Sequence, residues 1–93
     1  MRIVLDPEAV DDLRGIYQWI ARDNLAAARA VIERLLDSIE HLGSFPKMGR
    51  MGRDEGTREW PVPRLPYIVV YEVHSERDEL AVLAIFHGAQ ERE

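Results

Sequence analysis

The chain has 93 residues, of which 46% are hydrophobic and 31% charged, and its formal net charge is −5. That length allows one domain with a single core, and the composition is typical of a folded protein rather than a disordered one. The lack of cysteine excludes a disulfide framework, a cysteine zinc site and a cysteine nucleophile. No stretch approaches the roughly 20 apolar residues that span a bilayer, so we expect a cytoplasmic protein without a membrane partner.

The first half of the chain predicts a strand and two helices. A short apolar run, residues 3–5, ends at Asp6 and Pro7, which suit a helix N-cap and the first helical position. Apolar residues then recur at helical spacing over residues 7–22 and 25–42, and the first stripe comprises Val10, Leu13, Ile16, Tyr17 and Ile20. Gly43 is placed to end the second helix in a left-handed conformation. We therefore expect two antiparallel helices joined by a tight turn.

The second half predicts three strands. Residues 57–62 can form the first, which Pro61 restricts to an edge or a bulge. Residues 67–73 and 80–86 are rich in β-branched and aromatic side chains and are joined by a polar turn. The order β-α-α-β-β-β predicts an α+β fold over residues 1–93, with the helical hairpin packed on one face of a small, mainly antiparallel four-stranded sheet.

The stretch between the hairpin and the sheet is unusual in its charge. Residues 43–71 carry five Lys or Arg and three Asp or Glu, and they form the only net positive third of the chain. The acidic whole disfavours binding to a long nucleic-acid duplex but allows a small basic patch. Gly49, Gly52 and Gly56 match neither the Walker nor the dinucleotide-binding spacing and lead into a strand, which argues against a phosphate loop.

Few side chains of this chain suit catalysis. His41, His74 and His87 lack metal-ligand spacing, so no zinc site is predicted. His87 ends an apolar strand and could point across the sheet as a general acid or base, or could be a hydrogen-bonded structural residue. Trp60 lies on the expected edge strand and could either face a partner or close the core.

Four phrases of the sequence, taken together and in this order, resemble the RelE/ParE superfamily of bacterial type II toxins. They are Phe45-Pro46-x-x-Gly49-Arg50, Gly56-Thr57-Arg58-Glu59, Tyr67-Ile68-Val69-Val70-Tyr71 and Ile85-Phe86-His87-Gly88. The resemblance covers nearly the whole chain. It implies a growth-inhibiting toxin that needs no cofactor or metal and is neutralised by a small cognate antitoxin protein.

The resemblance implies two alternative mechanisms. RelE-like members cleave mRNA on the ribosome, which would make His87 a general acid or base and Arg58 and Arg64 stabilisers of the phosphate. ParE-like members block DNA gyrase and are not nucleases. In either case the expected RNA- or target-binding residues are Lys47, Arg50, Arg53, Trp60 and Tyr67.

The acidic composition and the lack of a tyrosine after His87 weaken the nuclease alternative. The same arginines could equally bind antitoxin carboxylates in bidentate geometry. A further alternative is a non-toxic α+β protein-interaction domain.

Overall fold

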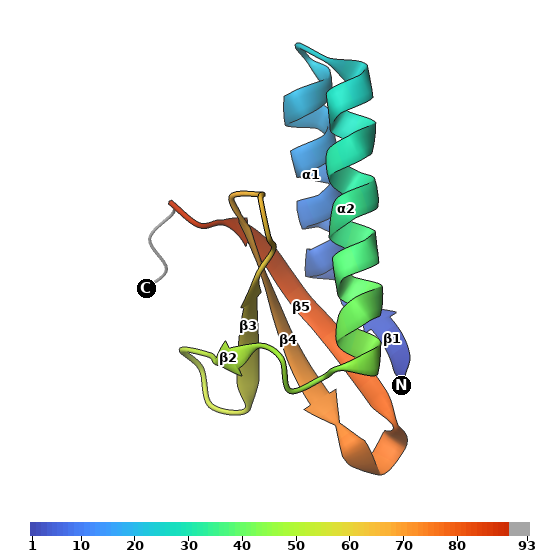
Figure 1. The fold of residues 1–93 in the computed structure, drawn as a ribbon, viewed down its shortest axis with the longest axis vertical. Helices are drawn as coiled ribbons and strands as arrows, with labels where there is room; N and C mark the ends of the chain where they lie inside the picture. The colour runs from blue at the N-terminus through green and yellow to red at the C-terminus, as the bar shows by residue number, and fades with distance from the viewer. Residues whose placement is uncertain (90–93) are drawn as a thin grey trace.

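A helical hairpin covers one face of a five-stranded mixed sheet in a computed structural model that describes residues 1–89 (Figure 1). The helices are α1 (Pro7–Ala21) and α2 (Leu25–Ser44), and a 3₁₀ turn, η1, spans Ser75–Arg77. The strands are β1 (Arg2–Leu5), β2 (Arg50–Met51), β3 (Thr57–Pro61), β4 (Tyr67–His74) and β5 (Glu79–His87). The predicted α+β class and the helical hairpin are confirmed. Residues 90–93, which include the end of the predicted domain, lie outside the described part.

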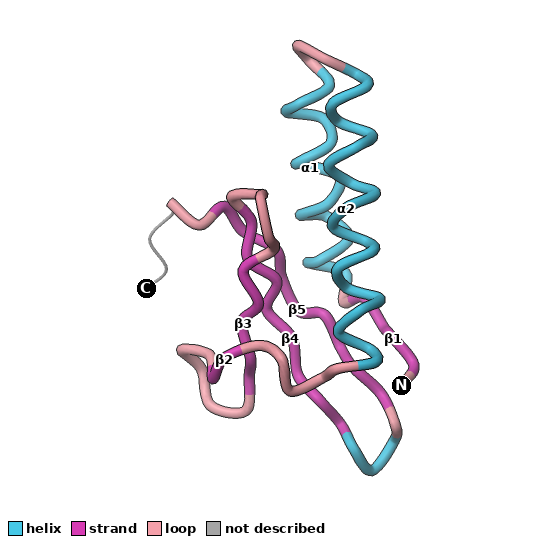
Figure 2. The backbone as a smooth tube through the Cα atoms, viewed as in Figure 1, coloured by secondary structure: helices cyan, strands magenta, loops and turns pink. Residues whose placement is uncertain are grey.

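The sheet has the strand order β1-β5-β4-β3-β2, one strand more than expected. The additional strand, β2, pairs antiparallel with β3 through only two residues of the glycine-containing stretch, too few for any alternation to reveal it. β1 pairs parallel with β5, so that Ile3 lies opposite Leu80. The first and last strands are therefore neighbours, and the tube in Figure 2 shows the other strands following β5 as a meander.

Both helices differ from the predicted pattern in detail. In α1, Leu13 and Ile16 pack against the core as predicted, but Val10 is 36% exposed and the preceding Ala9 is buried. α2 begins at the Asn24 cap, whose side-chain oxygen accepts a hydrogen bond from the Ala27 N–H at 3.0 Å. Gly43 does not end α2. It lies inside the helix, where an added Cβ would lie 3.0 Å from Ile3 Cδ1, so β1 approaches α2 closely at this position.

The core lies between the hairpin and the sheet. Side chains alternate along a strand, and Tyr67, Val69 and Tyr71 of β4 belong to the same buried cluster as Leu35 and Leu42 of α2. The fully buried large side chains are Tyr71, Leu35, Leu42, Leu80, Val69 and Val82. The opposite face of the sheet is not covered by a helix, and the tip of the hairpin projects beyond the sheet (Figure 1).

Candidate functional site

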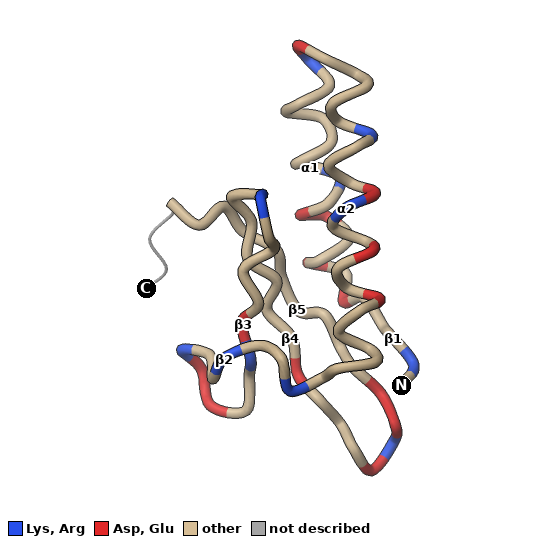
Figure 3. Tube along the Cα trace, viewed as in Figure 1, with Lys and Arg blue, Asp and Glu red and all other residues tan. Residues whose placement is uncertain are grey.

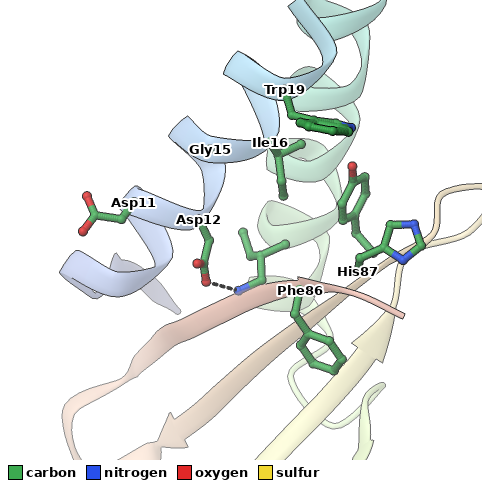
Figure 4. Close-up of a pocket in the computed structure, with 9 residues that line it drawn as sticks. Asp11, Asp12, Gly15, Ile16, Trp19, Phe86 and His87 are labelled. Atoms are coloured by element: carbon green, nitrogen blue, oxygen red, sulfur yellow. Dashed lines mark hydrogen bonds between the residues drawn. The ribbon is translucent and has the colours of Figure 1, made fainter. Parts of the chain in front are cut away.

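A groove of about 420 Å³ lies where α1 crosses the end of β5 (Figure 4). One wall is the helix and the other is the sheet, and the lining residues are Asp11, Asp12, Gly15, Ile16, Trp19, Tyr67, Ile85, Phe86 and His87. Figure 4 shows the Trp19 ring above the sheet and His87 beside the groove, whereas the Phe86 ring points toward the other face of the sheet. Aromatic surface and two carboxylates suit recognition of a protein segment more than phosphate binding.

The groove follows an incompletely paired edge of the sheet. β1 pairs with β5 only from Glu79 to Val82, so within residues 1–89 the later part of β5 has no strand on that side. Asp12 of α1 reaches across this gap, and its Oδ2 accepts a hydrogen bond from the Ile85 N–H at 2.8 Å. A side chain thus satisfies a backbone donor that a neighbouring strand would otherwise pair.

Trp19 and His87 lie at the two sides of this groove (Figure 4). Trp19 is 69% exposed, with the guanidinium carbon of Arg22 5.3 Å from its ring centroid. His87 contacts Tyr67 edge to face at 5.6 Å, and its Nδ1 lies 3.1 Å from the Ala89 N–H, which donates to it. Because Nδ1 is the acceptor, the neutral imidazole carries its hydrogen on Nε2.

Arg58, by contrast, makes its hydrogen bonds within the fold, and it lies opposite Tyr71 near the middle of β4. Its Nη1 donates to the carbonyl of Gly49 at 2.8 Å and to that of Lys47 at 3.4 Å. Beside it, the buried Tyr71 hydroxyl accepts from the Gly49 N–H at 2.9 Å and donates to the Pro46 carbonyl at 2.7 Å. Burial raises the pKa of Tyr71, and the Gly49 hydrogen bond and the charge of Arg58 oppose that rise.

The two aromatic residues predicted to contact RNA or a target both contribute to the core. Trp60 is half-buried, and its indole Nε1 donates to Ser38 Oγ of α2 at 3.1 Å. Tyr67 is 9% exposed and belongs to the core cluster. Little of either ring is left for stacking on a base.

The predicted cationic residues occupy two separate places. Lys47, Arg50 and Arg53 are exposed around β2, and Arg50 Nη2 lies 3.7 Å from Glu59 Oε1. Arg64 is exposed in the turn between β3 and β4, where it adopts a left-handed φ of 66°. That turn lies at the His87 end of the sheet, away from Arg58.

Of the three residues predicted to be catalytic, Arg64 lies in the turn at the His87 end of the sheet, whereas Arg58 lies apart from both. Arg58 pairs with Tyr71, and His87 pairs with Tyr67, so four residues of β4 and two strand spacings separate Arg58 from His87. At about 3.3 Å per residue and about 4.8 Å per strand, their Cα atoms lie roughly 16 Å apart. In this structure the Arg58 guanidinium instead binds the carbonyls of Gly49 and Lys47, so it is not placed to share a phosphate with His87.

The described residues offer little else for catalysis or membrane insertion. Within residues 1–89, no group of three or more His, Cys, Asp or Glu side chains is placed to hold a metal ion. Among the helices of that range, neither is long and apolar enough to cross a membrane.

Sequence reasoning missed Trp19 and Asp12 as residues of the groove. Trp19 lies outside the stripe of apolar residues expected to face the core, and a large aromatic residue on the polar side of a helix was the available signal. Nothing local pointed to Asp12, because its hydrogen-bond partner Ile85 is distant in sequence.

Comparisons with known proteins agree with this fold. The structure matches the chromosomal ParDE toxin–antitoxin system from P. aeruginosa with a TM-score of 0.81 at 20% identity, covering 94% of this chain and 95% of that chain. It also matches the intact E. coli RelBE toxin–antitoxin complex with a TM-score of 0.71 at 16% identity, covering 98% of both chains. The fold is thus that of a RelE/ParE superfamily toxin.

The sequence comparisons are more specific. The model of the family described as ParE toxin of type II toxin-antitoxin system, parDE, matches residues 3–92. The curated relative "Putative toxin Y4kP" from Sinorhizobium fredii is 32% identical over 83 residues, which cover 89% of this chain and 83% of that protein. The chain belongs to the ParE toxin family, and it is the toxin component of a type II toxin–antitoxin system.

Proposed function

We propose that this toxin arrests growth as a protein inhibitor of DNA gyrase and that it has no nuclease activity. Membership of the ParE family supports this target, because the resemblance implies that ParE-like members block gyrase. The single observation that carries the proposal is the placement of Arg58 four residues along β4 and two strands away from His87. The alternative mechanism, mRNA cleavage, requires these groups at one phosphate.

The electrostatics of the sheet point the same way. On the face without helices, β3 and β4 present Glu59 and Glu72 together with the apolar side chains of Ile68 and Val70. The carboxylate of Glu59 is 12% exposed and lies beside Arg50. A protein partner suits such a mixture of apolar and charged groups.

A supercoiling assay tests the target directly. Purified toxin at micromolar concentrations is added to gyrase and relaxed plasmid, and we expect supercoiling to be inhibited. His87→Ala should inhibit equally well and should still arrest growth when induced, because the imidazole has no catalytic task in this mechanism. Unaffected supercoiling, or new 5′ ends on translated mRNA that disappear in His87→Ala, would favour the nuclease instead.

We further propose that a cognate antitoxin neutralises the toxin by binding the α1–β5 groove. The structural neighbours include toxin–antitoxin complexes, and the groove offers the exposed Trp19 ring with Asp11 and Asp12 beside it. These groups suit a segment with apolar and basic side chains.

The product of the adjacent open reading frame is the probe for this groove. We expect Trp19→Ala to weaken its co-purification with the toxin, and Leu36→Ala, which removes a 43% exposed side chain from α2, to leave it unchanged. Equal co-purification of both variants would contradict this assignment without affecting the gyrase proposal.

A further inference from the structure

Residues 45–53, which we call the anchored segment, are tied to the sheet through side chains rather than through regular structure. Tyr71 holds the backbone of Pro46 and Gly49, and Arg58 holds the carbonyl of Gly49 from the other side. Glu59 Oε2 accepts a hydrogen bond from the Arg53 N–H at 3.1 Å. The segment is therefore fixed along its length, although only Arg50 and Met51 form a strand.

This fixed backbone presents large apolar side chains to solvent. Met51 is 71% exposed and Phe45 is 56% exposed. The Phe45 ring stacks at a tilt on His41, with ring centroids 4.9 Å apart, which keeps the ring at the surface. Exposed apolar groups on a restrained backbone cannot withdraw into the core, and such groups mark contact sites for other proteins.

Two hollows flank Lys47. The first, of about 490 Å³, is lined by Ser44, Phe45, Pro46, Lys47 and Met48 and is almost wholly apolar. The second, of about 230 Å³, is lined by Lys47, Met51, Gly56, Thr57, Arg58, Val73 and Ser75 and has polar and apolar parts. A partner segment that crosses Lys47 can place an apolar side chain in the first hollow and an acidic one near Lys47 and Arg58 in the second.

The charge of the segment selects the partner. The anchored segment holds Lys47, Arg50 and Arg53 and no acidic residue, although the whole chain has a net charge of −5. Figure 3 shows basic positions around β2, with acidic positions in the loop that follows. An acidic partner is attracted to the anchored segment and repelled by the rest of the molecule, which orients the encounter.

We propose that the anchored segment is the surface through which the toxin binds its cellular target, and that the target offers an acidic protein segment carrying an apolar side chain. The target is chosen over the antitoxin because the groove proposed above for the antitoxin lies where His87 pairs with Tyr67, away from the anchored segment. A protein is chosen over nucleic acid because one hollow is apolar and Met51 is exposed. Naming the target as gyrase rests on the proposed function.

The experiment compares Lys47→Glu, Met51→Ala and the double variant with two controls on α2, Arg29→Glu and Leu36→Ala. The controls make the same kinds of change at exposed positions of the helix. We expect the double variant to need at least about tenfold more toxin to inhibit supercoiling, as for the loss of interface hot spots, while both controls match the wild type. Thermal unfolding and co-purification with the product of the adjacent open reading frame should be unchanged in all variants.

The other outcomes of this experiment distinguish failure of the inference from failure of the proposed function. If wild-type toxin inhibits gyrase and the double variant inhibits equally, the anchored segment is not the target surface and the proposed function stands. If wild-type toxin leaves gyrase supercoiling unchanged, the proposed function fails, and growth arrest then tests the surface. Growth arrest by the double variant would overturn the inference. Loss of growth arrest in the double variant would support the anchored segment as the contact surface for another target.

Two further outcomes would overturn the assignment of the partner. Loss of co-purification in the double variant would identify the surface as an antitoxin contact. Retention of wild-type toxin on DNA at physiological salt, weakened by Lys47→Glu and not by Met51→Ala, would identify the partner as nucleic acid.

Discussion

The hydroxyl of Tyr71 and the backbone of Gly49 are joined at 2.9 Å in the interior of the protein, and this contact connects the central strand to the glycine-containing stretch. The same hydroxyl donates to the Pro46 carbonyl, so it acts as both donor and acceptor to the backbone of residues 46–49. The side chain of Tyr71 is fully buried, so no water replaces these partners if the hydroxyl is removed. The path of residues 46–49 thus depends on one phenol.

Tyr71→Phe should destabilise the protein by about 1–3 kcal/mol, because the Gly49 N–H is left buried without its acceptor. Tyr17→Phe is the matched control: Tyr17 is half-buried, and its hydroxyl has no hydrogen bond within residues 1–89. Urea unfolding of both variants measures the difference. Equal free energies of unfolding for the two would show that the anchored segment does not depend on Tyr71.

Gly49→Ala should also destabilise the protein, because a Cβ at this position would lie 2.5 Å from the Tyr71 hydroxyl and 3.0 Å from the Glu59 carbonyl. Overpacking of this kind costs about 1–3 kcal/mol. Gly15→Ala provides the opposite case, since nothing lies within 4 Å of its Cβ position in α1. There we expect a gain of about 0.5–1 kcal/mol from helix propensity, and a loss in chemical denaturation would contradict this placement.

Leu35→Ala should cost about 2–5 kcal/mol, because it empties space in the core beneath α2. The next residue, Leu36, is 43% exposed, whereas Leu35 is wholly buried, so Leu36→Ala should change the free energy of unfolding by about 0.5 kcal/mol or less. Denaturant midpoints for the two variants give the comparison. Similar values would mean that the buried face of α2 has been assigned wrongly.

Glu79 should make stability depend on pH. The hydrogen bond from Arg2 and the nearby charge of Arg77 hold the pKa of Glu79 below its ordinary value of 4.5. Its contribution is therefore fully present above pH 4.5 and is lost as the pH falls through the lowered folded-state pKa. Glu79→Gln should be less stable than wild type near neutral pH, and the difference should shrink under acid.

Unfolding measured at about pH 7 and about pH 3 tests this dependence. Glu76→Gln is the control, since that side chain is 68% exposed. A difference between wild type and Glu79→Gln that does not change with pH would refute the role given to the carboxylate.

The candidate site could be predicted from the sequence only in part. The residue pattern of 57–62 correctly predicted that Arg58 lies on a strand. The hydrogen bonds of its guanidinium, however, depend on where the fold places the carbonyls of Gly49 and Lys47. Arg64 is carried away from Arg58 by a turn in which it takes a left-handed φ. Arg58 and His87 lie on the same face of the sheet, because they pair with Tyr71 and Tyr67, which both face the core. Four residues of β4 separate them, and this spacing depends on strand register, which residue type alone does not encode.

The sequence by itself determined the class of fold, the two helices, the strong strands β4 and β5, and the resemblance to RelE/ParE toxins. These follow from hydrophobic periodicity and from phrases of a few residues, which are local properties of the chain. Only the tertiary structure decided that β1 pairs with β5, that Asp12 closes the edge above Ile85, and that Tyr71 anchors Gly49. Each of these contacts joins residues far apart in sequence, so each depends on the packing of the whole core and leaves no local pattern.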